Sequence, residues 1–320
     1  MKKLLASLAA IVLILGFGAP VQAAYPEQPI TLICPWGAGG GTDAVARIVA
    51  TLIQKDLGVP INVVNRTGGS GVTGHQAIRT AKADGYTIGI GTVELAMMHW
   101  MGLTDMTVKD FSPIGAVNLD PAGITVAANA PWATYKDYEA AIKANPGKFK
   151  NSGTGMGGIW HLAQGAWLTA LDLSASALRW IPTDGAAQAI QELMAGGVDS
   201  ITCSLPEASA MLNAKRVKAL AIMADERDPN YPDVPTLKEL GVSATIGTWR
   251  GIVAPKGLPQ DIQARLEDAL AKVVASKEFT DFMQSRGYGV HWIKGQEFGE
   301  FMIKADEDNG VIMKAAGLAK

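Results

Sequence analysis

The feature that most constrains this chain of 320 residues is a regular alternation of short β-rich runs with longer helical stretches near its start. Residues 30–34, 61–64 and 86–91 are compact apolar runs rich in β-branched side chains, as expected of buried strands. Between them, residues 42–56 and 72–83 have the character of helices, and the first repeats apolar residues at helical spacing. This strand–helix–strand order predicts an α/β fold in which a mostly parallel sheet is flanked by helices.

The same rhythm returns later in the chain and predicts a second α/β lobe. Strands are expected over 124–128, 148–152, 177–181, 199–203 and 217–223, and helices over 135–145, 160–171, 185–195 and 206–213. A strand over 248–254 and helices over 260–276, 277–284 and 296–315 are expected to return to the first lobe. We predict one lobe from residues 24–123 plus 246–320 and another from 124–245, with a ligand cleft between them.

The first two dozen residues are typical of a secretory signal peptide. Lys2 and Lys3 precede an uncharged apolar run over 4–18, and Val21 and Ala23 supply the small residues of a cleavage site. A membrane anchor is the alternative, but this run is shorter than the ~20 apolar residues that span a bilayer. We predict that residues 1–23 are removed, with the cut after Ala23, and that the protein works in the periplasm.

Charge and cysteine content narrow the possible function classes. The 28 basic and 30 acidic side chains lack the basic footprint of a nucleic-acid-binding protein, so nucleic acid is not an expected partner. Cys34 and Cys203 are too few for a disulfide framework. Two buried free thiols are the preferred interpretation, and a disulfide between them is the alternative that an exported compartment permits.

A glycine-rich loop at residues 35–43 connects the first predicted strand to the first predicted helix, with the sequence Pro-Trp-Gly-Ala-Gly-Gly-Gly-Thr-Asp. Glycine lets the backbone approach a ligand closely, and the free N–H groups of the next helical turn favour an anion. Thr42 or Asp43 is expected to cap that helix. A plain strand-to-helix turn is the alternative, but the loop holds more glycine than such a turn needs.

Two further glycine loops, at residues 65–71 and 152–158, also follow predicted strands. Ligands of open α/β sheets bind beyond the carboxyl ends of the strands, so the three loops are expected to meet in one cleft. The third loop spells G-x-G-x-x-G from Gly153 to Gly158, but Asp172 lies at a helix end and not after the next strand. A dinucleotide site is therefore the weaker interpretation.

Several motifs, taken in order, resemble the periplasmic receptors of tripartite tricarboxylate transporters, also called the Bug family. Residues 35–43 resemble the family pattern P-x-x-A-G-G-x-x-D, and residues 65–71 resemble N-R-x-G-A-x-G. Similar matches follow at 83–87, 152–162, 184–199, 232–236 and 249–255. Each motif alone is weak, but together they cover nearly the whole chain after the leader.

The resemblance implies two α/β domains of the periplasmic binding-protein type (type II-like) that close on a small organic carboxylate. It implies delivery of that ligand to the membrane subunits of a transporter, and no catalysis. A monomer without metal or cofactor is expected. The ligand class stays open between di- or tricarboxylates, aromatic acids and acidic amino acids.

The resemblance also implies that the matching loops form the ligand-binding site. The expected ligand-binding residues of the loops are Gly37, Ala38, Gly39, Gly40, Thr42, Asp43, Gly69, Ser152, Gly153, Thr154, Gly155 and Gly157. His161 is expected to support the third loop at the start of its helix.

Four larger side chains, Trp36, Trp160, Trp249 and Arg250, fall at expected cleft positions. A tryptophan there could hold a bulky acid, or it could belong to the core. Arg250 could bind a ligand carboxylate in bidentate fashion, or it could form a salt bridge between the lobes. Both alternatives stay open for these residues.

Two acidic residues, Asp43 and Asp184, also belong to the expected site. Arg47 lies one helical turn after Asp43 and is its expected ion-pair partner. An acidic group repels an anion unless a water or an ammonium group lies between them, which keeps an amino acid among the possible ligands.

The remaining residues give no sign of catalysis. The four histidines are not at metal-ligand spacing, and no nucleophile–base arrangement can be argued from the sequence. The first hypothesis is a solute receptor. An exported hydrolase or nucleotide-linked enzyme would need titratable groups gathered in the cleft, and a sensor subunit with the same fold is the third possibility.

Overall fold

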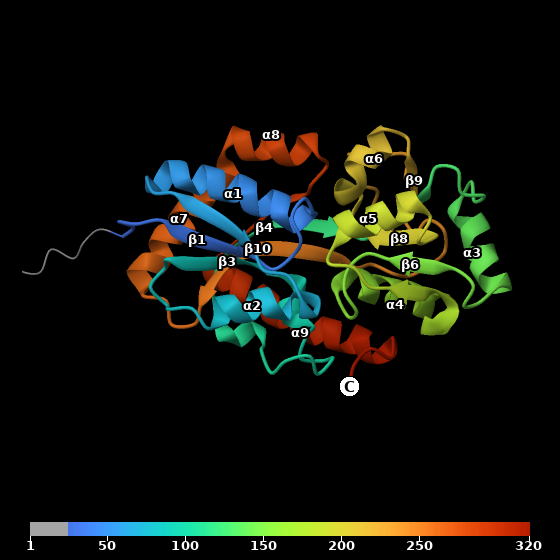
Figure 1. Ribbon diagram of the computed structural model, residues 1–320, viewed down its shortest axis with the longest axis horizontal. Helices are drawn as coiled ribbons and strands as arrows, with labels where there is room; N and C mark the ends of the chain where they lie inside the picture. The colour runs from blue at the N-terminus through green and yellow to red at the C-terminus, as the bar shows by residue number, and fades with distance from the viewer. Residues whose placement is uncertain (1–24) are drawn as a thin grey trace, which may run out of the picture.

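The computed structural model describes residues 25–320, so the predicted signal peptide lies outside the described residues. Two sheets lie side by side, and helices cover both faces of each (Figure 1). We call the six-stranded sheet with its helices the first lobe and the five-stranded sheet with its helices the second lobe. The two-lobed α/β architecture predicted from the sequence is confirmed.

The six-stranded sheet has the order β11-β4-β10-β3-β1-β2. Its strands are β1 (Ile30–Cys34), β2 (Ile61–Asn65), β3 (Thr87–Thr92), β4 (Phe111–Pro121), β10 (Gly247–Pro255) and β11 (Val290–Lys294). The strand β1 runs parallel to β2 and β3, whereas β10 runs antiparallel to both β3 and β4. The sheet is thus mixed and not mostly parallel, because β4 leads toward the second lobe and β10 returns from it.

Successive side chains of β1 are buried on opposite faces of this sheet. Leu32 and Cys34 belong to the apolar core that includes α1 (Gly41–Leu57), α7 (Gln260–Ala275) and α8 (Lys277–Ser285). Ile33 points the other way, into the core that includes α2 (Val72–Arg79) and α9 (Gly295–Ala315). Successive strand residues face opposite sides, so a continuous apolar run such as β1 predicts a strand covered on both faces.

The five-stranded sheet has the order β7-β6-β8-β5-β9 and is mixed as well. Its strands are β5 (Gly123–Ala127), β6 (Lys150–Ser152), β7 (Arg179–Ile181), β8 (Ser200–Cys203) and β9 (Val217–Ile222). Its helices are α3 (Tyr135–Ala144), α4 (Ile159–Ala170), α5 (Ala186–Ala195) and α6 (Ser209–Asn213). The strand β6 is parallel to β7 and β8, and β5 is antiparallel to β8 and β9.

Three chain segments are joined by backbone hydrogen bonds where the chain passes between the lobes. The Ala122 amide donates to the Ile246 carbonyl at 2.9 Å, and the Met223 amide donates to the Ala122 carbonyl at 2.7 Å. The Ile246 amide in turn donates to the Met223 carbonyl at 3.1 Å. The strands of the two sheets meet at this point, close to the predicted lobe boundaries, which stay a prediction.

The helix α9 runs through Gly310 without a break and ends beside the second lobe (Figure 1). A side chain at Gly310 would begin 2.6 Å from the indole of Trp100, so glycine is what allows that ring to pack on the helix. Beyond α9, Ala316 and Leu318 approach Gly165 of α4. Across residues 25–320, no helix is both long and apolar enough to cross a membrane.

Candidate functional site

A cavity of about 80 Å³ lies between the lobes, with room for several water molecules. The first lobe contributes the loop that follows β1, residues after β3, and two residues of β10. The second lobe contributes Thr154 and the first turns of α4, α5 and the short helix η5 (Leu205–Ala208). Residues far apart in sequence are therefore brought to one cavity.

About half of the residues expected at the ligand site line this cavity. They are Trp36, Gly37, Ala38, Gly40, Thr42, Thr154, Trp160, Asp184 and Arg250. Gly39, Asp43, Gly69, Ser152, Gly153, Gly155, Gly157 and Trp249 lie outside the lining. The cavity is also lined by residues that were not among the expected ligand-binding residues, although some of them belong to the matched motifs: Gly41, Thr92, Glu94, Ile159, Gly185, Ala186, Ala187, Gln188, Glu207 and Thr248.

The first glycine loop is held in place by Asp43. Its carboxylate accepts a hydrogen bond from the Gly39 amide at 3.0 Å and from the Asn65 side chain at 2.9 Å, and it forms an ion pair with Arg47 at 2.9 Å. Burial acts to raise the pKa of Asp43, but these partners prevail and lower it below its usual value. The predicted pair with Arg47 is confirmed, and Asp43 faces the loop and not the cavity.

The start of α1 corrects one prediction. Neither Thr42 nor Asp43 caps the helix, because the N-cap is Gly40 and no side chain accepts from the first turn as a cap. The N-caps of α4 and α5 are Gly158 and Gly185, which also lack a capping side chain of their own. Three helix N-termini thus face the cavity without the local side-chain oxygen that usually satisfies such N–H groups.

The glycine loop of the second lobe, residues 152–158, is held in place by His161. The Gly157 amide donates to Nδ1 of His161 at 3.0 Å, which confirms the expected support by this histidine. Burial lowers the pKa of His161 to about 4, so the ring is neutral and can accept at that nitrogen. A side chain at Gly153 would begin 2.3 Å from the Thr202 carbonyl oxygen, which explains why this position is glycine.

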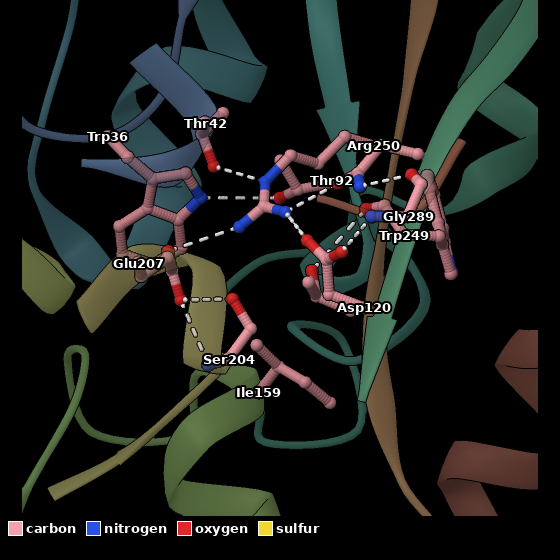
Figure 2. Close-up of polar contacts among 12 residues, drawn as sticks. Trp36, Thr42, Thr92, Asp120, Ile159, Ser204, Glu207, Trp249, Arg250 and Gly289 are labelled. Atoms are coloured by element: carbon pink, nitrogen blue, oxygen red, sulfur yellow. Dashed lines mark hydrogen bonds and ion pairs between the residues drawn. The ribbon is translucent and has the colours of Figure 1, made fainter. Parts of the chain in front are cut away.

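Arg250 is 2% exposed and lies at the centre of a buried polar network (Figure 2). Its Nη1 forms an ion pair with Asp120 of β4 at 2.9 Å and also donates to Asn118. Its Nη2 reaches Glu207 of the second lobe at 3.1 Å, and its Nε donates to Thr42 at 3.1 Å. Arg250 therefore forms the interlobe salt bridge that the sequence left as one of two alternatives.

The carboxylates of this network titrate above their usual range. Burial raises the pKa of Asp120 to about 6, although Arg250 acts to lower it. Burial likewise raises the pKa of Glu207, against the effect of Arg250 and of hydrogen bonds from Ser204 and Gly41. One guanidinium thus stabilises two carboxylates that are largely removed from bulk solvent.

The three tryptophans at expected cleft positions have different surroundings. Trp36 and Trp160 line the cavity, and Nε1 of Trp36 donates to the Thr92 hydroxyl at 3.3 Å. Trp249 packs edge-on against Phe298 of α9 at a ring distance of 5.4 Å, on the far side of Arg250 from Trp36 (Figure 2). Adjacent strand residues face opposite sides, so Arg250 and Trp249 cannot both reach the cavity.

Glu94 is a lining residue that no motif indicated. It lies in the short helix η2 (Val93–Ala96) after β3 and is only 2% exposed. Its Oε1 accepts a hydrogen bond at 3.0 Å from the amide of Ile159, the first residue of α4 in the other lobe. The one sequence signal that could have indicated Glu94 is its position just after the end of a strand. Its hydrogen-bond partner is 65 residues away, so no local motif includes both residues.

Cys34 and Cys203 are both free and buried, and they belong to different apolar cores. The preferred sequence interpretation of two buried thiols is confirmed, and the disulfide alternative is wrong. Burial raises the pKa of Cys34 to about 11 and that of Cys203 well above its usual value, so neither is a reactive thiolate at neutral pH.

We expect the native protein to react slowly with Ellman's reagent and to release two thiols per chain once it is denatured without reductant. Cys203→Ser should reduce the denatured count to one. A count of zero in the denatured wild type would mean that the two cysteines pair after all.

The described residues offer no metal site, because no group of three or more His, Cys, Asp or Glu side chains within 25–320 is arranged to hold an ion. The buried charges of the site are instead bound to one another. The cavity can supply backbone N–H groups, hydroxyl groups, two indole rings and the charged side chains of Glu94, Asp184, Glu207 and Arg250, a set suited to binding a small polar molecule.

Comparison with known proteins agrees with this geometry. Residues 45–318 match the tripartite tricarboxylate transporter family receptor. A protein encoded between tcbD and tcbE in Pseudomonas sp. strain P51 is 30% identical over 268 residues, covering 82% of this chain and 79% of the relative.

Two solved structures have the same fold. The periplasmic binding protein BugD is 28% identical with a TM-score of 0.87, covering 92% of this chain and 100% of the other. MatC from Rhodopseudomonas palustris with bound malate is 25% identical with a TM-score of 0.83, covering 92% of this chain and 100% of the other. The chain therefore belongs to the family of tripartite tricarboxylate transporter receptors, which are periplasmic solute-binding proteins.

Proposed function

We propose that the protein captures a small organic carboxylate in the cavity between its lobes and delivers it to the membrane subunits of a tripartite tricarboxylate-type transporter. The observation that carries this proposal is the convergence of three helix N-termini on one cavity. Gly40–Thr42 begin α1, Ile159 and Trp160 begin α4, and Gly185–Gln188 begin α5. Helix dipoles at such ends favour an anion, and the N–H groups at the start of α5 have no carboxylate partner among the described residues.

The position of the cavity between the two lobes supports capture and not turnover. Residues of both lobes close the cavity, and the Gly37 amide donates across it to the Asp184 carbonyl at 3.4 Å. The titratable groups of the lining are bound in ion pairs or hydrogen bonds, except that Asp184 is exposed. Malate bound to the similar MatC protein supports a carboxylate as the ligand class.

A thermal-shift screen of the mature protein tests the ligand class. We expect one or a few acids, among di- and tricarboxylates, aromatic acids and amino acids, to raise the melting midpoint. A ligand at about 100 times its Kd adds about 2.7 kcal/mol to the free energy of unfolding. If no acid in the panel moves the midpoint of a folded sample, the proposed carboxylate receptor is wrong.

Delivery is tested separately by uptake of the best acid, radiolabelled, into cells that lack this protein. We expect uptake to fall and to be restored by the wild-type chain. Unchanged uptake alongside tight binding in solution would assign the protein to sensing and not to transport.

A further inference from the structure

Glu94 of the first lobe holds the position at the start of α4 where an anion would bind. Its Oε1 accepts from the Ile159 amide, and its Oε2 lies within hydrogen-bond distance of the Thr92 hydroxyl. The α4 N-terminus has no capping side chain from its own segment. A carboxylate of the opposite lobe therefore satisfies the end of this helix.

Thr92 links Glu94 to His75 and Trp36 through hydrogen bonds. Nδ1 of His75 lies 2.8 Å from the Gly71 carbonyl and must carry the proton, so its Nε2 accepts from the Thr92 amide at 3.3 Å. Trp36 donates to the Thr92 hydroxyl, and that hydroxyl has two acceptors, Oε2 of Glu94 and, at 3.4 Å, Nε2 of His75. When the hydroxyl donates to Glu94, both oxygens of the carboxylate accept a hydrogen bond.

A second carboxylate holds the start of α1 in a similar way. Glu207 of the second lobe lies so close to Gly41 that a side chain there would begin 2.7 Å from its Oε1. The Gly41 amide acts to lower the pKa of Glu207, as a hydrogen bond to the carboxylate would. Of the three helix N-termini that face the cavity in the described part of the chain, only that of α5 lacks a carboxylate partner from the protein.

The charge of the lining disfavours a ligand with two negative groups. Among the described residues that line the cavity, Arg250 is the only lysine or arginine, and Asp120 and Glu207 already pair with it. Burial raises the pKa of Glu94, against the hydrogen bonds from Thr92 and Ile159. A second anion beside it would raise that pKa further, and this added repulsion opposes binding of a dicarboxylate. Each carboxylate oxygen can accept a second hydrogen bond, so Glu94 can still bind a donor group in the cavity.

We propose that Glu94 is a specificity-determining residue that takes the place of a second ligand carboxylate, so that the receptor prefers a monocarboxylate carrying an N–H donor, such as an ammonium or amide group, over a dicarboxylate. This inference rests on the proposed function. The ligand carboxylate binds at the start of α5, and the donor group faces Glu94. Both an attractive contact for the donor and repulsion of a second anion then set the selectivity.

Isothermal titration with matched probes tests the proposal. Succinate, its monoamide and γ-aminobutyrate share a chain length and differ at one end, and the malonate and glutarate series extend the comparison. We expect the wild type to bind the amine or amide member of the best series at least about tenfold more tightly than the dicarboxylate, because Glu94 attracts a donor group and repels a second carboxylate.

Glu94→Gln keeps the side-chain shape and removes the charge, and we expect it to reduce that ratio by at least about tenfold. Glu278→Gln is the matched control, because this glutamate of α8 has a side chain that is 62% exposed. It should leave the ratio unchanged.

Different results would overturn the role of Glu94 and the proposed function as a carboxylate receptor. A wild type that binds the dicarboxylate as tightly as its monoamide overturns the role of Glu94 and leaves the carboxylate receptor intact. This comparison needs no variant, so it holds even if Glu94→Gln folds poorly. A folded wild type that binds no carboxylate of any kind overturns the proposed function and the role of Glu94 together.

Discussion

Arg250→Ala is expected to lower the free energy of unfolding by about 3–5 kcal/mol, the cost of leaving a buried charge without its partner. The side chains of Asp120 and Glu207 are 1% and 5% exposed, so loss of the guanidinium leaves two buried carboxylates without a counter-ion. The variant also loses the hydrogen bonds to Asn118 and Thr42. Urea denaturation at neutral pH measures the change from the shift in midpoint at constant slope.

Arg227→Ala is the control for this substitution. Arg227 forms an ion pair with Glu239 at 3.0 Å in which both side chains are 45% exposed. Exposed pairs of this kind contribute about 0–1 kcal/mol, so its loss should be small. Equal destabilisation by the two variants would contradict the assignment of Arg250 as the buried link between the lobes.

Gly41→Ala is expected to weaken ligand binding by roughly tenfold to hundredfold, because overpacking of a closed site costs about 1–3 kcal/mol. A Cβ atom at this position would lie 2.7 Å from Cγ of Glu207, which belongs to the opposite lobe, and 2.8 Å from Nη2 of Arg250. The two lobes could then approach each other only after the network had shifted. Titration of the best acid against the variant measures the loss.

Gly299→Ala provides a control outside the cavity. Gly299 belongs to α9, and an added Cβ there would meet nothing closer than Cγ of Pro113 at 3.1 Å, in the same lobe. The affinity of this variant should stay near that of the wild type. If Gly41→Ala binds as tightly as this control, contact of Gly41 with the opposite lobe has no role in closure.

Much of the fold could be predicted because apolar periodicity marks each buried strand and each amphipathic helix. Two strands were not predicted, β4 (Phe111–Pro121) and β11 (Val290–Lys294). In β4, Pro113, Asn118 and Asp120 interrupt the apolar pattern, and proline in a strand argues against a strand. Asn118 and Asp120 both bind Arg250. The apolar strand pattern is therefore interrupted where polar side chains form the buried network.

The sequence predicted which loops form the candidate site, but it did not predict the contacts between residues far apart in the chain. The glycine loops indicated where helix N-termini would gather, and Trp36, Thr154 and Arg250 line the cavity. The side-chain period of two along a strand is a sequence signal that places Arg250 and Trp249 on opposite faces of β10. Glu94 could not be assigned from the sequence, because its partner Ile159 is joined to it only by the packing of the two lobes.

Isothermal titration of the mature protein with the best acid from the screen tests the central proposal most directly. We expect saturable heat with one ligand bound per chain, and recovery of the acid chemically unchanged after long incubation. Conversion of the acid to a product would mean that the cavity is an active site. Absence of saturable binding by every acid in the panel, in a sample shown to be folded, would contradict the proposal that this cavity is a carboxylate receptor.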